Sequence, residues 1–141
     1  MQRNPGLTNL LREAIGPESE DNTESLRALD SLADDSAFQQ KFAEVKRQNK
    51  VQLANLVAGR MGIRIDPSAM FDIQIKRIHE YKRQLLNIIE AVALYDQIRS
   101  HPELDWVPRV KLFAGKAAPS YHNAKLIIKL INSVAAVVNN D

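Results

Sequence analysis

The chain has 141 residues, no cysteine and a formal net charge of +2, with 45% hydrophobic and 26% charged residues. This is the composition of one globular domain. It excludes a disulfide scaffold, a thiolate zinc site, a cysteine nucleophile and a strongly basic nucleic-acid-binding protein. The sequence contains no apolar run that would span a bilayer and no signal-peptide core, so we expect a cytoplasmic protein without a membrane partner.

Residues 1–62 have the periodicity of helices. Asn4 can cap a first helix, in which Pro5 takes the first position. Leucines at three-residue spacing predict a second short helix: Leu26, Leu29 and Leu32. A third helix is expected from Ser36, as its cap, to about Arg60, with a loose apolar stripe and a solvated face.

Residues 63–141 read as strand, helix, strand and helix. The alternating "FDIQI" predicts a strand whose better-buried face carries Phe71, Ile73 and Ile75. A helix follows from about Tyr81 to Arg99, and we expect its buried face to carry Leu85, Leu86, Ile89, Val92, Ala93 and Ile98. The run "RVKLFA" predicts the second strand. The last helix, "AKLIIKLINSVAAVV", is apolar on most sides, so we expect deep burial.

This order predicts an α/β fold in which a helical N-terminal segment, residues 1–62, precedes a βαβα unit, residues 63–141. The two strands should be parallel and joined by a right-handed crossover. Because parallel sheets normally have more strands and two covered faces, we expect a truncated doubly wound (Rossmann-like) sheet. Both segments would then be a fragment of one larger catalytic domain. Unpaired sheet edges would let such a fragment dimerise or domain-swap.

The stretch "KRIHEYKRQLLN" concentrates positive charge where the first strand turns into a helix. Ligands of open α/β sheets bind beyond the carboxyl ends of the strands, where Lys76 and Arg77 lie. Lys82 is expected in the first turn of the helix, where cations are disfavoured, so a compensating anion such as phosphate is plausible chemistry. A solvated helix end explains the same charges, and the residues alone leave both interpretations open. Tyr81 is the only aromatic residue among these cations, which argues against a nucleic-acid-binding site.

The segment "GKAAPSYHN" follows the second strand and lacks the glycine spacing of a dinucleotide loop or a P-loop. We expect Ser120 to cap the last helix, while the roles of Tyr121 and His122 stay open. His79 and His122 follow adjacent strands, but "HEYKR" is not the H-E-x-x-H spacing. We therefore expect no metal site.

Two long segments, "FDIQIKRIHEYKRQLLN" and "GKAAPSYHNAKLIIKLIN", closely resemble the α-glucan phosphorylases, which are the glycogen, starch and maltodextrin phosphorylases. The segments "NPGLTNLLREAIG" and "VNND" resemble them too, so the similarity covers essentially the whole chain. It implies a fragment from the start of the C-terminal domain of a two-domain glycosyltransferase. The family releases glucose 1-phosphate from α-1,4-glucan with inorganic phosphate. It uses pyridoxal phosphate, whose phosphate group takes part in proton transfer.

The resemblance also implies residue roles. Arg77 and Lys82 would bind the substrate phosphate, and Lys76 would lie against the cofactor phosphate. The surroundings of the active site would include His79, Glu80, Tyr81, Ala118, Tyr121 and His122. Ser120 stands where the family usually has glycine, so the active-site entrance is expected to differ.

The same resemblance places the Schiff-base lysine beyond Asp141. We therefore expect no cofactor bound to this chain and no turnover of glucan by the chain alone. Two alternatives remain. The chain could be a stand-alone phosphate- or sugar-phosphate-binding α/β module, or it could be an interaction domain that self-associates.

Overall fold

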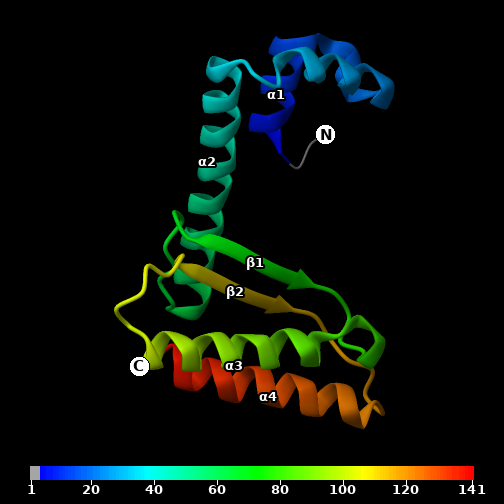
Figure 1. The fold of residues 1–141 in the computed structure, drawn as a ribbon. Coiled ribbons are helices and arrows are strands. Elements are labelled where there is room, and N and C mark those ends of the chain that lie inside the picture. The colour runs from blue at the N-terminus through cyan, green and yellow to red at the C-terminus, as the bar shows by residue number, and fades with distance from the viewer. Residues whose placement is uncertain (1–3) are drawn as a thin grey trace. The chain divides into compact units, whose positions relative to one another are not determined.

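The computed structural model describes residues 4–141, and the chain divides into two compact units between Ser68 and Ala69 (Figure 1). Unit 1 contains helices α1 (Pro5–Ile15) and α2 (Ser36–Met61) and the 3₁₀ helices η1 (Pro17–Glu20) and η2 (Thr23–Leu32). Unit 2 contains, in order, β1 (Met70–Ile75), η3 (Glu80–Lys82), α3 (Gln84–Ser100), β2 (Arg109–Ala114) and α4 (His122–Val138). None of the helices within residues 4–141 has the length and apolar character needed to cross a membrane.

The helix ends of unit 1 follow from local chemistry. The Asn4 side chain accepts a hydrogen bond from the Leu7 N–H at 3.2 Å and caps α1, as predicted. The leucines spaced by three residues fall in η2, because a 3₁₀ helix has three residues per turn. The cap of α2 is Asp35, not Ser36 as predicted. Its carboxylate accepts from the backbone N–H groups of the second and third following residues at 2.8 and 3.2 Å.

Unit 2 is built on two parallel strands. Phe71 of β1 lies opposite Val110 of β2, and Ile75 lies opposite Ala114. Figure 1 shows α3 next to the strands and α4 against α3. The α/β class and the parallel pairing are therefore confirmed, while a wider doubly wound sheet stays a prediction.

The face of β1 that packs against α3 is the polar one. Asn87 of α3 donates to the Gln74 side chain at 3.0 Å, and Lys111 of β2 donates to Asn87 at 3.0 Å. The prediction that the apolar side chains of β1 lie on the better-buried face is wrong, since Ile73 and Ile75 are 40% and 62% exposed. Polar side chains can occupy the covered face because they bond one another there.

The predicted buried faces of the two long helices are also wrong. Gln84 and Ile88 are the buried residues of α3, whereas every residue predicted to be buried there is exposed: Leu85, Leu86, Ile89, Val92, Ala93 and Ile98. Only Ala124 and Ile127 of α4 are buried, in a core with Ile78, so its predicted deep burial is wrong as well. Both helices carry apolar side chains on more than one face, and tertiary contacts select which face is covered.

Candidate functional site

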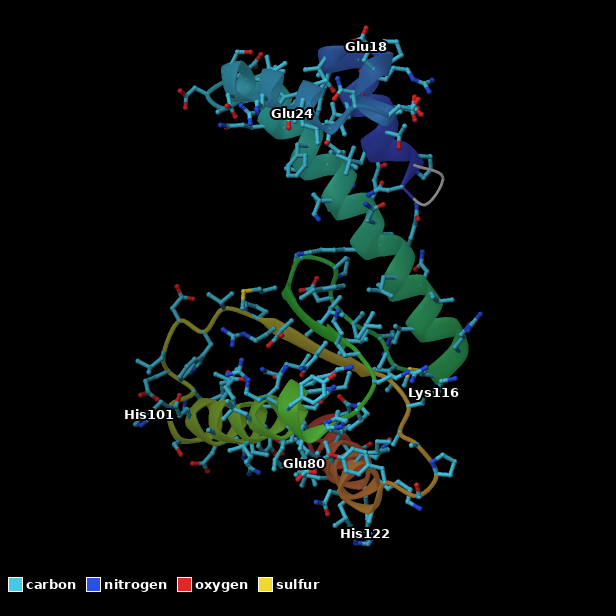
Figure 2. The ribbon with its side chains drawn as sticks, turned by 90° about the vertical axis from the view of Figure 1, so that its right-hand side faces the viewer. Glu18, Glu24, Glu80, His101, Lys116 and His122 are labelled. Atoms are coloured by element: carbon cyan, nitrogen blue, oxygen red, sulfur yellow. The ribbon has the colours of Figure 1, made fainter. Side chains whose placement is uncertain are left out.

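Two loops leave the carboxyl ends of the parallel strands and lie side by side. We call Lys76–Arg83 the cation loop and Gly115–Tyr121 the second loop. The backbone N–H of Lys76 donates to the Ala114 carbonyl at 3.0 Å, and that of Ile78 donates to the Lys116 carbonyl at 3.2 Å. Figure 2 views unit 2 from this end, so Glu80, Lys116 and His122 face the viewer. Strand-like pairing therefore continues from the sheet into both loops.

Gly115 lets the two loops approach each other. A Cβ atom at this position would lie 2.0 Å from the Lys76 carbonyl oxygen and 3.1 Å from the Ile78 Cδ1 atom. Real Cβ atoms essentially never lie within 3.0 Å of a heavy atom outside their own residue and its two chain neighbours. The first position of the second loop therefore needs glycine, because a side chain there would clash with Lys76.

The cations of the cation loop have no acidic partner among residues 4–141. Lys76 and Arg77 are exposed and Lys82 is half-buried, and within residues 4–141 none of the three forms an ion pair. The Lys82 ammonium lies 5.4 Å from the centre of the Tyr81 ring. Lys82 ends η3, before α3 begins at Gln84, so the prediction that it lies in the first turn of the helix is wrong.

Glu80, the carboxylate of the cation loop, is held by neutral groups. The Tyr121 hydroxyl donates to it at 2.6 Å, and the Asn123 side-chain amide donates at 3.2 Å. These hydrogen bonds, that of Tyr121 first, lower the pKa of Glu80, and the same contact with Glu80 raises the pKa of Tyr121. Glu80 thus connects the cation loop to the second loop and to α4 and pairs with none of the neighbouring cations.

Aromatic rings join the two loops beside Glu80. The His79 ring lies 4.3 Å from the Tyr81 ring and 4.9 Å from the Tyr121 ring, measured between centroids. Its Nδ1 accepts from the Tyr81 N–H at 3.4 Å. The structure therefore brings together four of the residues that the sequence singled out: His79, Glu80, Tyr81 and Tyr121.

Two further residues predicted near the site, Ala118 and His122, lie at the surface. Ala118 is exposed, and its carbonyl accepts from the Tyr121 N–H at 3.0 Å. His122 is exposed at the first position of α4. The prediction that Ser120 caps α4 is wrong, because the turn ends one residue later and Tyr121 takes the cap position without a side-chain hydrogen bond.

Two glutamines that the sequence analysis did not single out support the cation loop. Gln84 is fully buried, and its side-chain amide donates to the Arg77 carbonyl at 3.1 Å. Gln74 donates to the Lys82 carbonyl at 2.9 Å. Gln84 and Ile88 are spaced by four residues on the covered face of α3, but other residues of this helix share that spacing, so it does not identify Gln84.

The chemistry of this end of unit 2 suits an anion. Lysine and arginine donors, together with backbone carbonyls already bound by amides, favour an anionic ligand rich in hydrogen-bond acceptors, such as phosphate. Among residues 4–141, no three His, Cys, Asp or Glu side chains come close enough to hold a metal ion.

Comparison with known proteins gives one consistent family. Residues 1–141 match the carbohydrate phosphorylase family. The chain is 50% identical to a glycogen phosphorylase of Synechocystis sp. and 47% identical to the liver form of human glycogen phosphorylase, each over 138 residues. Both matches cover 98% of this chain and 16% of the relative, so the chain spans about a sixth of their length. The resemblance seen in the sequence is confirmed, and the chain belongs to the carbohydrate phosphorylase family.

Proposed function

We propose that this chain is part of an α-1,4-glucan phosphorylase that releases glucose 1-phosphate from glycogen or maltodextrin with inorganic phosphate. The observation that carries the proposal is the cation loop, which presents Lys76, Arg77 and Lys82 at the carboxyl ends of two parallel strands without acidic partners among the described residues. Relatives named glycogen phosphorylase match nearly the whole chain, which supports the same assignment.

Arg77 and Lys82 are the proposed ligands of the substrate phosphate. A guanidinium offers two parallel N–H donors to two phosphate oxygens, and an ammonium adds a mobile point charge. Charges that are already in place also stabilise the redistribution of charge in the transition state, because no reorganisation is needed during the reaction.

Lys76 is the proposed ligand of the phosphate group of pyridoxal phosphate. The donor set fits that group, since Lys76 is exposed next to Arg77 and carries no acidic partner among residues 4–141. The bound cofactor would supply a phosphate group that takes part in proton transfer. We propose that the lysine binding it covalently lies outside these 141 residues, so the chain alone neither holds the cofactor covalently nor turns over glucan.

The remaining residues named by the family resemblance are proposed to surround the reacting groups. His79, Glu80 and Tyr81 would line the cleft beside the phosphates. Ala118, Tyr121 and His122 would lie at the entrance, where Ser120 adds a hydroxyl that the family usually lacks. The contact of Glu80 with Tyr121 keeps this carboxylate away from the phosphate-binding cations, which its negative charge would otherwise neutralise.

A chimaera tests the proposal. The chain replaces the matching 138 residues of the Synechocystis glycogen phosphorylase, and formation of glucose 1-phosphate from glycogen and phosphate is measured. We expect an active chimaera and an inactive isolated chain. A chimaera that folds and retains the cofactor but makes no glucose 1-phosphate would refute the proposal.

The isolated chain tests the alternative of a stand-alone phosphate-binding module. Calorimetric titration with inorganic phosphate should give no tight binding. Tight binding that is lost in Arg77→Ala and kept in Lys129→Ala, where an exposed cation of α4 is removed, would favour that module.

A further inference from the structure

The segment that carries Arg77 is held from both sides. On one side, the N–H groups of Lys76 and Ile78 donate to backbone carbonyls of the strand-end segment at residues 114 and 116, at 3.0 and 3.2 Å. On the other side lies the Gln84 side chain. It donates to the Arg77 carbonyl at 3.1 Å and accepts from the His79 N–H at 3.4 Å.

This pattern is that of a parallel strand neighbour. A residue in such a neighbour donates to the carbonyl before the opposing residue and accepts from the N–H after it. The Gln84 amide does both around Ile78, which is 4% exposed. One side chain therefore replaces a strand and fixes the backbone on both sides of Ile78.

The fold brings Gln84 to this place through a tight reversal. After η3 the chain turns at Arg83, whose φ of +61° lies in the left-handed region, and α3 begins at the next residue. The Gln84 side chain is 0% exposed, so water does not compete for its amide. An amide buried in this way must keep its partners or leave polar groups unsatisfied, which makes the contact persistent.

We propose that Gln84 is a positioning residue for phosphate binding, an inference that rests on the proposed function. Its amide fixes the backbone of Arg77 and directs the Arg77 carbonyl into the protein, away from an anionic ligand. The guanidinium then meets phosphate from a backbone that is already ordered, and binding loses less conformational entropy. Gln74 acts in the same way on the Lys82 carbonyl, which it binds at 2.9 Å.

The test uses Gln84→Met in the chimaera, which removes both hydrogen-bonding groups at similar side-chain length. Gln97→Met, at an exposed glutamine of the same helix, is the matched control. We expect Gln84→Met to raise the KM for phosphate about tenfold, the effect of a lost buried hydrogen bond. The KM for glucan should stay unchanged. Hydrogen exchange should accelerate in the peptide that covers residues 76–83, and Gln97→Met should show none of these effects.

Gln84→Glu keeps the proposal testable if Gln84→Met does not fold. Its carboxylate keeps the acceptor for His79 but loses the donor for Arg77, and protonation restores that donor. We therefore expect its KM for phosphate, relative to that of Gln97→Met at the same pH, to fall as the pH is lowered.

The outcomes separate the two proposals. A chimaera with Gln84 intact that makes no glucose 1-phosphate overturns the proposed function. An active chimaera in which Gln84→Met accelerates exchange but leaves the KM for phosphate unchanged overturns the positioning role alone. Unchanged exchange in Gln84→Met, or a pH-independent KM ratio in Gln84→Glu, overturns that role as well.

Discussion

Gly115→Ala should destabilise unit 2, because the new Cβ atom would lie 2.0 Å from the Lys76 carbonyl oxygen. To reach the 3.0 Å limit of real contacts, the loops must separate by about 1 Å. That movement breaks the flanking bonds from Lys76 to Ala114 and from Ile78 to Lys116, which measure 3.0 and 3.2 Å. Two lost hydrogen bonds and the overpacking together cost about 3 kcal/mol.

Urea unfolding of the chain, followed by the fluorescence of Trp106, measures this cost. Trp106 is the single tryptophan and lies in unit 2, where its indole N–H donates to the His101 carbonyl at 2.8 Å. The midpoint should fall by about 3 M urea, given a denaturant slope near 1 kcal/mol per M for a unit of this size. Gly59→Ala is the matched control, since a Cβ atom there meets nothing within 4 Å, and it should not lower the midpoint. A midpoint for Gly115→Ala equal to that of the unsubstituted chain would refute the packing argument.

Two further predictions concern charged contacts of unit 2. Lys111→Met should destabilise the unit by about 2 kcal/mol in the same urea assay. The Lys111 side chain is only 13% exposed, and its ammonium pairs with Asp72 and Glu90, which would lose this partner. Unchanged stability would contradict this. Glu80→Gln should lower the pKa of Tyr121 toward that of free tyrosine, measured by NMR titration of the ring, and an unmoved titration curve would argue against the contact. Because the pKa of Glu80 is lowered in the folded state, its contact with Tyr121 stabilises the fold at pH values above the ordinary carboxyl pKa. This stabilisation is lost as the pH falls through the pKa of the folded state.

The sequence predicted those elements whose signals are local. Alternation in "FDIQI" located β1, and Asn4 and Pro5 located the start of α1, because strand period and capping act within a few residues. Ser36 and Ser120 were assigned as caps by residue type alone. In the structure Asp35 and Tyr121 take those positions, since the neighbouring turns decide which residue precedes the helix.

The buried faces could not be predicted in the same way. The sequence of α3 has apolar residues on most of its faces, so its periodicity did not identify the buried face, which carries Gln84 and Ile88. The strand pattern correctly predicted that Lys76 and Arg77 follow the first strand. The contacts that support the cation loop could not be predicted, because the bond between Glu80 and Tyr121 joins residues 41 positions apart, and the Gln84 contact depends on the reversal at Arg83. Such contacts depend on the packed fold and leave no spacing signal in one sequence.

The most direct test of the central claim is the phosphate dependence of glucose 1-phosphate formation by the chimaera with Arg77→Gln. Lys129→Gln, which removes an exposed cation of α4, is the control. If Arg77 binds the substrate phosphate, its replacement should raise the KM for phosphate by about tenfold to a hundredfold, the effect of one lost charge-assisted hydrogen-bond pair. The KM for glucan should change little, and the control should behave as the unsubstituted chimaera. Equal KM values for phosphate in Arg77→Gln and Lys129→Gln would contradict the account.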